Sequence, residues 1–295
     1  MVFNVKEINP KYDFQISGMS YIGNPKDKTC LFVVKKIQRM IKNLEGHKNC
    51  LVFIENGMSI PDGLQEQNCF VFVDNPQDEY GLFSLRMHEK EQKESANRAY
   101  KTMTGGYYLG ENVSLGENVR IDPGCLIDHD VVIGDDAYIG FGSVVRNATI
   151  GNHFRCYEYS IIGTESFNPG HKGDYTYRVP SFGKVIIGNH VDIGSHVVIE
   201  RGFNSDTVLR DGVMLDSGVI IGHDVILEDR TKITCGACVA GRVTVGRDTY
   251  IGMNSTIKQR LEIGQEAMVG MGSSVITNVK PETTVFGNPA KKIGI

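Results

Sequence analysis

The chain has 295 residues, which is enough for two domains, and a formal net charge of −4 at pH 7. It has no basic excess that would suggest nucleic-acid binding, no apolar run long enough for a membrane span, and no apolar signal-peptide core at its N-terminus. Its seven cysteines are odd in number and scattered, which argues against a disulfide framework. Composition therefore predicts a cytoplasmic protein that spans no membrane and binds no nucleic acid.

Residues 1–85 show the pattern of a small α/β domain. Three apolar segments, CLFVV at 30–34, CLVFI at 50–54 and CFVFV at 69–73, are predicted strands. The stretch 35–44 between the first two is predicted to be helical. No six-residue repeat occurs in this part of the chain.

Residues 86–106 are charged and rich in Ala, Gln, Glu and Lys, a composition typical of a helical connector. The pair Gly105 and Gly106 at its end marks a break in regular structure. We therefore expect a helical connector here, leading into a second domain.

From residue 107 to about 280 the dominant pattern is one aliphatic residue at every sixth position. A period of six fits neither a helix nor a plain strand alternation; it is the hexapeptide repeat of a parallel β-helix. Three hexapeptides make one triangular coil, so residues eighteen apart should stack on adjacent coils. Gly often follows the aliphatic residue, where we expect it to adopt a backbone conformation that other residues resist. The unbroken run comprises Leu209, Leu215, Ile221, Leu227, Ile233, Val239, Val245, Ile251, Ile257, Ile263, Val269 and Val275.

The repeat begins earlier and is interrupted twice. A first run leads from Leu109 to Val145. Residues 168–183 then break the period and contain Pro and Gly, so we interpret them as a loop inserted into the β-helix. A second insertion lies near 201–208, and residues 281–295 are expected to cap the last coil. Loops that leave a regular scaffold often carry binding or catalytic residues.

Cys235 and Cys238 have the spacing of a redox or metal-binding pair. They lie inside the hexapeptide register, and no second pair is near them in the sequence. We therefore interpret them as small side chains packed in tight coils, and we expect no metal site.

The β-helix itself suggests a reaction class, because left-handed hexapeptide helices are mostly acyltransferases and mostly trimers. Acyl transfer needs a base, a donor for the oxyanion and a groove for the thioester arm. His223 is the best candidate base, with Asp216 and Ser217 before it as groups that could orient or polarise its imidazole. Gly241 lies one coil further on, so its N–H could face the same groove. The alternative is a surface histidine and a glycine demanded by a turn.

Two other histidines compete for a place in this groove. His129 occupies the same hexapeptide position as His223 on earlier coils, and His196 lies one or two coils before His223. Either residue could line the groove, but each is a weaker candidate for the base.

The order of α/β domain, β-helix, inserted loop and HVVIERGFNSDTVLRDGVMLDSGVIIGHDVILED resembles UDP-3-O-acylglucosamine N-acyltransferases of lipid A synthesis. The resemblance covers most of the chain. It implies that His223 is the catalytic base, that Asp216 is a nearby functional aspartate and that the Gly241 N–H polarises the thioester. It also implies a nucleotide-binding N-terminal domain, in which Phe32 stacks on uracil and Lys35 lies in the binding segment CLFVVKK.

Several positions depart from that family. Gln38 stands where the family has a second aromatic partner for uracil, and Arg260 aligns with a further family histidine. The sugar-binding loop reads Ser166-Phe167-Asn168, so Phe167 and Asn168 are the expected acceptor contacts. The family's helical C-terminal extension for acyl carrier protein has no counterpart in this sequence.

The C-terminal third resembles a second family, the N-acetyltransferases of bacterial amino sugars. The resemblance rests on CGACVAGRVTVGRDTYIGMNSTIKQRLEIG, on VFGNPAKKI and on the pair His223-Asp224, which fits an H-[DE]-x-x-I-G string. It implies an acyl-CoA donor, whose phosphates Lys291 and Lys292 could meet; a solvated basic tail is the alternative. The expected donor contacts are Gly241, Arg260, Asn288, Lys291 and Lys292.

The sequence thus favours an N-acyltransferase that moves an acyl group from acyl-CoA to the amine of a nucleotide-linked amino sugar, without a tightly bound cofactor. One alternative is the lipid A enzyme itself, with hydroxyacyl carrier protein as donor. An alternative of another class is a non-catalytic β-helix scaffold or binding module.

Overall fold

The computed structural model describes residues 2–294, and its contacts divide them into two units. The first unit runs up to residue 97 and also includes residues 167–182, and the second contains 98–166 and everything from 183 onward. The inserted loop thus groups with the N-terminal domain. No helix in the described part of the chain is long and apolar enough to cross a bilayer.

The first unit is built on a parallel four-stranded sheet in the order β3-β4-β5-β6. Its two central strands are almost completely buried, and apolar side chains from the helices cover them. A separate antiparallel pair, β1 and β2, lies near the N-terminus. The bounds are β1 Phe3–Asn4, β2 Gln15–Ile16, β3 Gly18–Met19, β4 Thr29–Val33, β5 Leu51–Glu55 and β6 Cys69–Val73.

The helices of this unit differ from the sequence-based expectation. Helix α2 spans Pro76–Ser95, so it starts ten residues before the expected connector at 86–106 and ends inside it. It begins with Pro in its first turn, and the Asn75 side chain accepts a hydrogen bond from the Asp78 N–H at 3.2 Å. It also buries Tyr80, Phe83 and Met87, so most of α2 belongs to the core of the first unit.

The stretch 35–44 forms 3-10 turns, labelled η2 (Lys35–Leu44), instead of a regular α-helix, since Ile37 has non-helical backbone angles. Two short pieces complete the set, η1 (Val5–Glu7) and α1 (Leu64–Gln67).

The inserted loop folds as an antiparallel hairpin of β18 (Pro169–Lys172) and β19 (Tyr175–Arg178). Tyr177 on the hairpin packs against α2 at Gly81, where an added Cβ would come within 2.5 Å of the Tyr177 hydroxyl. A glycine in the middle of a helix costs stability, and here it makes room for the hairpin.

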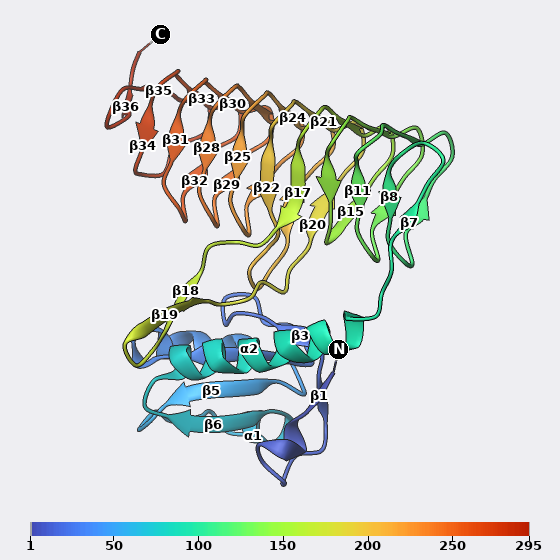
Figure 1. The fold of residues 1–295 in the computed structure, drawn as a ribbon. Coiled ribbons are helices and arrows are strands. Elements are labelled where there is room, and N and C mark those ends of the chain that lie inside the picture. Colours follow the sequence, from blue (N-terminus) through green and yellow to red (C-terminus); the bar gives the residue numbers. More distant parts are fainter. Residues whose placement is uncertain (1, 295) are drawn as a thin grey trace. The chain divides into compact units, whose positions relative to one another are not determined.

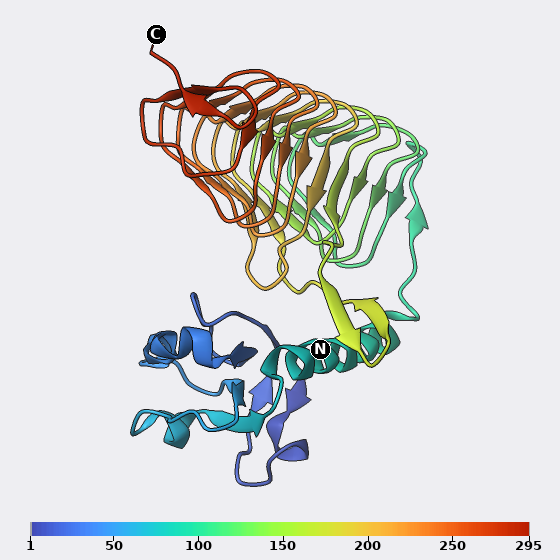
Figure 2. The same ribbon diagram turned by 90° about the vertical axis from the view of Figure 1, so that its left-hand side faces the viewer.

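The second unit is a parallel β-helix whose coils stack in register (Figure 1). Figure 2 shows the coils from one end, with the chain turning through three sides in each. Strand partners lie eighteen residues apart, as in Ile221 with Val239 and Leu227 with Val245. We call the three sides faces A, B and C in chain order.

Face A consists of β7 (Lys101–Thr102), β8 (Tyr108–Leu109), β11 (Leu126–Ile127), β14 (Val144–Val145), β17 (Ile161–Thr164), β22 (Val198–Glu200), β25 (Ile220–Ile221), β28 (Cys238–Val239), β31 (Thr256–Ile257) and β34 (Ser274–Val275). Face B consists of β9 (Ser114–Leu115), β12 (Val132–Ile133), β15 (Ala148–Ile150), β20 (Val185–Ile187), β23 (Thr207–Leu209), β26 (Ile226–Leu227), β29 (Thr244–Val245) and β32 (Glu262–Ile263). Face C consists of β10 (Arg120–Ile121), β13 (Tyr138–Ile139), β16 (Arg155–Cys156), β21 (Asp192–Ile193), β24 (Met214–Leu215), β27 (Lys232–Ile233), β30 (Tyr250–Ile251), β33 (Met268–Val269), β35 (Thr284–Phe286) and β36 (Lys291–Lys292).

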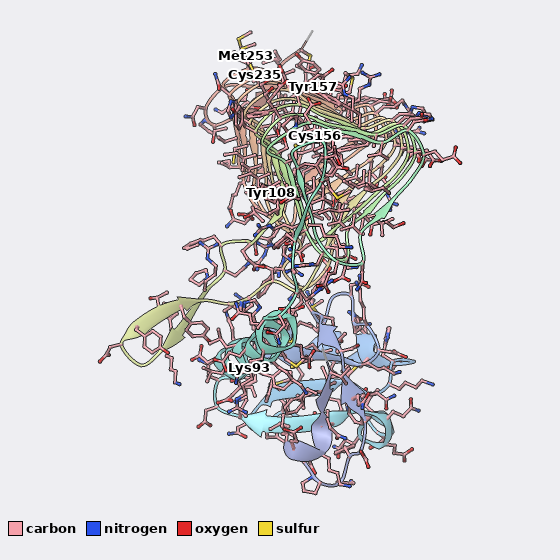
Figure 3. All side chains as sticks on the ribbon, turned by 45° about the vertical axis from the view of Figure 1, so that its right-hand side comes forward. Lys93, Tyr108, Cys156, Tyr157, Cys235 and Met253 are labelled. Carbon is pink, nitrogen blue, oxygen red and sulfur yellow. The ribbon has the colours of Figure 1, made fainter. Side chains whose placement is uncertain are left out.

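The sixth-position aliphatic residues form the core of the β-helix. From Leu209 to Val275 each of them is at most 2% exposed, and they belong to one continuous apolar cluster. Burial of one such side chain contributes about 1.5–3 kcal/mol, so stability accumulates coil by coil. Alternate residues point outward, as the buried Cys156 and its exposed neighbour Tyr157 illustrate (Figure 3).

Glycine follows the aliphatic residues for a different physical reason than the sequence analysis expected. Gly222 and Gly246 do not have positive φ angles. A Cβ at Gly222 would instead lie 2.7 Å from the backbone nitrogen of Gly241 on the next coil. The left-handed conformation falls two residues later, at Asp224 and Asp248, with φ of 57° and 58°. Glycine is therefore needed here for the close approach of coils.

Both insertions leave the β-helix at the same corner, where face A turns into face B. The first follows β17, which ends at Thr164, and the second follows β22, which ends at Glu200. The chain re-enters on face B at Val185 and Thr207. This A/B corner therefore carries both irregular segments of the scaffold.

Candidate active site

His223 lies at the A/B corner, two residues after the buried Ile221 of β25. Its Nδ1 is 2.8 Å from Oδ2 of Asp224, and the histidine side chain is 18% exposed while that of Asp224 is 2% exposed. A carboxylate accepts only, so Nδ1 carries the proton and Nε2 is left as the basic nitrogen. No described residue forms a hydrogen bond with Nε2.

Asp224 is held from several sides. Its Oδ1 accepts hydrogen bonds from the backbone N–H groups of Phe203 and Ser205 and from the Ser205 hydroxyl, at 2.9, 3.0 and 2.7 Å. Its Oδ2 accepts from Arg242 Nε at 3.3 Å. Burial by itself would raise the pKa of Asp224, but hydrogen bonds from His223 and Ser205 and the charges of His223 and Arg242 outweigh it and lower the pKa to about 2. Asp224 is therefore a carboxylate at neutral pH.

Gly241 lies beside the imidazole, one coil beyond His223. A Cβ at this position would lie 2.6 Å from Nε2 and 2.8 Å from Cε1 of His223, so the ring occupies the space that a side chain would need. Within residues 2–294, no acceptor pairs with the Gly241 N–H, whereas the neighbouring Ala240 and Arg242 N–H groups bond to adjacent coils. A basic nitrogen and an unpaired N–H donor thus lie together, as base and oxyanion donor should in acyl transfer.

Three residues around His223 were not predicted from the sequence. They are Asp224 as its partner, Glu200, whose Oε2 accepts a hydrogen bond from the His223 N–H at 3.1 Å, and Phe203, whose ring centroid is 6.1 Å from the imidazole. Glu200 and Phe203 border the second insertion. The sequence signal that could have identified them is the position of that insertion, about one coil before His223.

Asp216 and Ser217 lie at another corner, where face C turns into face A. Asp216 accepts a hydrogen bond from the Ser217 N–H at 2.7 Å, and the imidazole of His223 pairs with Asp224 instead. Asp216 and Ser217 line a cavity of about 370 Å³ with Asp192, Lys232 and other residues of face C. Within one chain they do not orient the imidazole, which corrects that part of the expectation.

His196 also lies at the C/A corner, where its ring stacks on Tyr159 at 5.5 Å. His129 is at the A/B corner, as expected, but on earlier coils. Its Nδ1 accepts from the Glu111 N–H at 2.7 Å and its ring packs on Tyr100 at 4.6 Å. Neither imidazole is placed beside an unpaired N–H as His223 is.

Of the expected donor residues, Arg260 lies on the same corner as His223. The Arg260 N–H donates to the Gly241 carbonyl at 3.1 Å, so Arg260 lies one coil beyond Gly241. Lys291 and Lys292, on β36, line a cavity of about 390 Å³ with Lys280, Thr277 and Asn278. Asn278 and Thr277 follow β34 at the A/B corner. Asn288 is not among the residues that line this cavity.

In the first unit, the expected nucleotide contacts lie on and just after β4. The Phe32 ring is 5.1 Å from the ring of Tyr80 on α2, and Lys35 forms an ion pair with Glu55 at 3.5 Å. Asn56 donates to Asp74 at 2.7 Å at the ends of the next two strands. Carboxyl ends of parallel strands are where open α/β sheets bind ligands, and these side chains lie at that edge of the sheet.

Phe167 and Asn168 are at the base of the inserted hairpin, within the first unit. Phe167 is 68% exposed, and the Arg178 guanidinium lies 5.2 Å from its ring centroid. The Asn168 carbonyl accepts from the Val179 N–H at 2.8 Å. The described residues contain no group of three or more metal-binding side chains, and Cys235 and Cys238 are free thiols.

A family model described as "Bacterial transferase hexapeptide (six repeats)" matches residues 112–147. UDP-3-O-acylglucosamine N-acyltransferase 2 of Legionella pneumophila (strain Lens) is 41% identical over 80 residues, 27% of this chain and 23% of that protein. UDP-3-O-acylglucosamine N-acyltransferase of Dechloromonas aromatica is 42% identical over 65 residues, 22% of this chain and 19% of that protein. The matched segments thus span about a quarter or less of these relatives.

Two solved structures share the β-helix. UDP-N-acetylglucosamine acyltransferase from Campylobacter jejuni has a TM-score of 0.57 at 25% identity, with 64% of this chain and 73% of that chain covered. LpxA from Acinetobacter baumannii has a TM-score of 0.60 at 25% identity, with 66% and 74% covered. The predicted fold class, a left-handed parallel β-helix with a small N-terminal α/β domain, is confirmed. Residues 112–147 thus match a hexapeptide-repeat family, and part of the chain is similar in sequence to UDP-3-O-acylglucosamine N-acyltransferases.

Proposed function

We propose that this protein is an N-acyltransferase that acylates the amine of a UDP-linked, 3-O-acylated glucosamine, as in lipid A synthesis. The proposal rests on the arrangement of three residues at the A/B corner. There His223 presents Nε2 beside the unpaired Gly241 N–H, while its Nδ1 is bound to the buried Asp224 carboxylate.

In the proposed reaction, Nε2 of His223 takes a proton from the acceptor amine as the nitrogen attacks the thioester carbonyl carbon. The carbonyl oxygen becomes an oxyanion, which the Gly241 N–H stabilises. The tetrahedral intermediate then collapses, the C–S bond breaks, and the thiolate takes the proton from the imidazolium. Asp224 stabilises the imidazolium while it exists, and an amide and a free thiol are released.

The acceptor assignment is supported by the relatives named for UDP-3-O-acylglucosamine. The polar edge of the first unit, where Lys35 pairs with Glu55, would hold the nucleotide, with the half-buried Phe32 ring as the platform for the base. Phe167, largely exposed beside Arg178, would contact the sugar or its acyl chain together with Asn168.

The donor in this proposal is a hydroxyacyl thioester on acyl carrier protein. A second candidate, an acyl-CoA-dependent enzyme for another nucleotide amino sugar, is favoured by one observation. Three lysines, Lys280, Lys291 and Lys292, line the cavity at the last coil, where they could meet CoA phosphates. Either donor would pass Arg260 on its way to Gly241.

We further propose that the protein acts as a cytoplasmic homotrimer. Asp216, Ser217 and His196 share the C/A corner and do not reach His223 of their own chain. In a trimer, that corner of one subunit could contribute to the site of the next.

The test is thiol release by the purified protein with a panel of nucleotide amino sugars. Hydroxyacyl carrier protein, acetyl-CoA and a longer acyl-CoA are offered side by side. Release with the carrier protein and UDP-linked 3-O-acylglucosamine supports the first proposal, and release only with CoA supports the second. His223→Ala should abolish turnover without changing the oligomeric state. Failure with every donor would point to a non-catalytic scaffold or binding module.

A further inference from the structure

We infer that the second insertion, residues 201–206, is a clamp that fixes Asp224, and that Ser205 and Arg242 are positioning residues for the His223 imidazole. The inference deepens the proposed function, since it rests on His223 acting as the base. Neither Ser205 nor Arg242 would touch the substrate in this role.

The clamp meets Asp224 on its Oδ1 side. Three donors converge there within 3.0 Å, the Phe203 and Ser205 N–H groups and the Ser205 hydroxyl. The Asp224 N–H in turn donates to the Thr207 hydroxyl at 2.9 Å, just after the insertion. One short segment therefore binds both the side chain and the backbone of Asp224.

Arg242 contacts the other oxygen of the Asp224 carboxylate. Its Nε donates to Oδ2 of Asp224 at 3.3 Å, and its terminal nitrogen donates to Asn204 Oδ1 at the same distance. One guanidinium thus joins the carboxylate to the clamp. Because Oδ1 is fully engaged and Oδ2 is shared by Arg242 and His223, the carboxylate has little freedom to rotate away from Nδ1.

The clamp is itself fixed at its base. Added Cβ atoms at Gly183 and Gly202 would both overlap the carbonyl oxygen of Ser205, so the segment lies directly on these two glycines. Arg201 Nε donates to the Gly183 carbonyl at 2.7 Å, and Asp206 accepts from the Lys184 N–H at 2.8 Å. The loop is therefore a rigid part of the scaffold.

Two charged side chains face the His223–Asp224 pair. Arg242 faces Asp224, and Glu200 faces His223 through the histidine N–H. The clamp keeps Asp224 ionised and pointed at Nδ1. This arrangement selects the tautomer with the proton on Nδ1 and leaves Nε2 available as the base.

The first experiment compares steady-state kinetics of Ser205→Ala, Ser205→Thr and the control Thr249→Val. Thr249 donates its part-buried hydroxyl to the Gly264 carbonyl at 2.8 Å on another corner, so the control loses a comparable hydrogen bond. We expect Ser205→Ala to lower kcat about tenfold with KM values within twofold, because a hydrogen bond to a charged group is lost. Ser205→Thr should restore the rate, and Thr249→Val should leave it unchanged. Equal kcat in Ser205→Ala and the control would overturn the inference.

A second readout does not depend on turnover. Histidine side-chain nitrogen shifts, assigned to His223 by comparison with His223→Gln, report the tautomer directly. We expect the Nδ1–H form alone in the native protein at pH 8, and a mixture of tautomers in Ser205→Ala and Arg242→Met. If the protein shows no acyl transfer, a locked native tautomer that becomes mixed in the variants still supports the clamp. An unchanged tautomer in both variants refutes it, whatever the activity.

Discussion

Replacement of Gly241 by Ala tests the geometry of the site most directly. The new Cβ would lie 2.6, 2.8 and 2.9 Å from Nε2, Cε1 and Cδ2 of His223, all closer than real Cβ contacts. The imidazole must therefore tilt away, and its 2.8 Å bond to the anchored Asp224 resists that tilt. The backbone N–H remains in the alanine variant, so the change displaces the base and keeps the oxyanion donor.

We expect Gly241→Ala to lower kcat about 100-fold, the size of effect that a displacement of about 1 Å has on a reacting group. Overpacking should cost about 1–3 kcal/mol of unfolding free energy, measured by denaturant titration. Gly18→Ala is the matched control, since the closest atom to its new Cβ is a Thr29 methyl at 3.9 Å. If Gly241→Ala turned over at nearly the native rate while His223→Ala were inactive, the ring would not lie where we place it, and the reasoning would be refuted.

Three further predictions concern charge and binding. Asp224 has an ordinary pKa of 3.8 that folding lowers to about 2, so its stabilising contribution is complete above pH 4 and is lost as the pH falls through 2. At about 1.4 kcal/mol for each pKa unit, the loss should be about 2–3 kcal/mol, and urea titrations of Asp224→Asn should lack it. If the protein uses the second candidate donor, acyl-CoA, then Lys291→Ala with Lys292→Ala should raise the KM for acyl-CoA several-fold and change the KM for the acceptor little. Equal KM values for acyl-CoA would then remove these lysines from the donor site. Phe32→Ala should raise the KM for the nucleotide sugar about tenfold, with kcat preserved, and an unchanged KM would show that no base stacks there.

The β-helix was largely predictable, because one physical requirement repeats along the sequence. Each coil must bury one aliphatic side chain per strand, and residues such as Ile221 and Val239 show this with no exception in the second run. The glycines after them were predictable in position but not in cause. Their role depends on the distance between neighbouring coils, as the close approach of Gly222 to the Gly241 nitrogen shows. The sequence of a single hexapeptide does not contain that distance.

The first unit was harder to predict, because its helix signals are weaker than its strand signals. Strands β4, β5 and β6 fall where the apolar segments indicated. The charged stretch from residue 86 suggested a connector, yet α2 starts at Pro76 and uses Tyr80 and Phe83 to pack on the sheet. The start of α2 is set by burial of one helix face against the sheet. Local composition does not reveal that burial.

The two predictions about the partners of His223 had different outcomes for a geometrical reason. A separation of eighteen residues returns the chain to the same corner one coil later, so Gly241 lies beside the ring. A separation of seven is one hexapeptide plus one residue, which moves the chain to another corner; Asp216 therefore lies at the C/A corner while His223 lies at the A/B corner. The residue that does reach the imidazole, Asp224, is adjacent in sequence and adopts the left-handed conformation. In a hexapeptide helix, side chains at one corner are thus separated by a few residues or by multiples of eighteen, apart from insertions. That rule places Arg242 and Arg260 on the His223 corner, and it makes any contribution from Asp216 a matter of a second subunit.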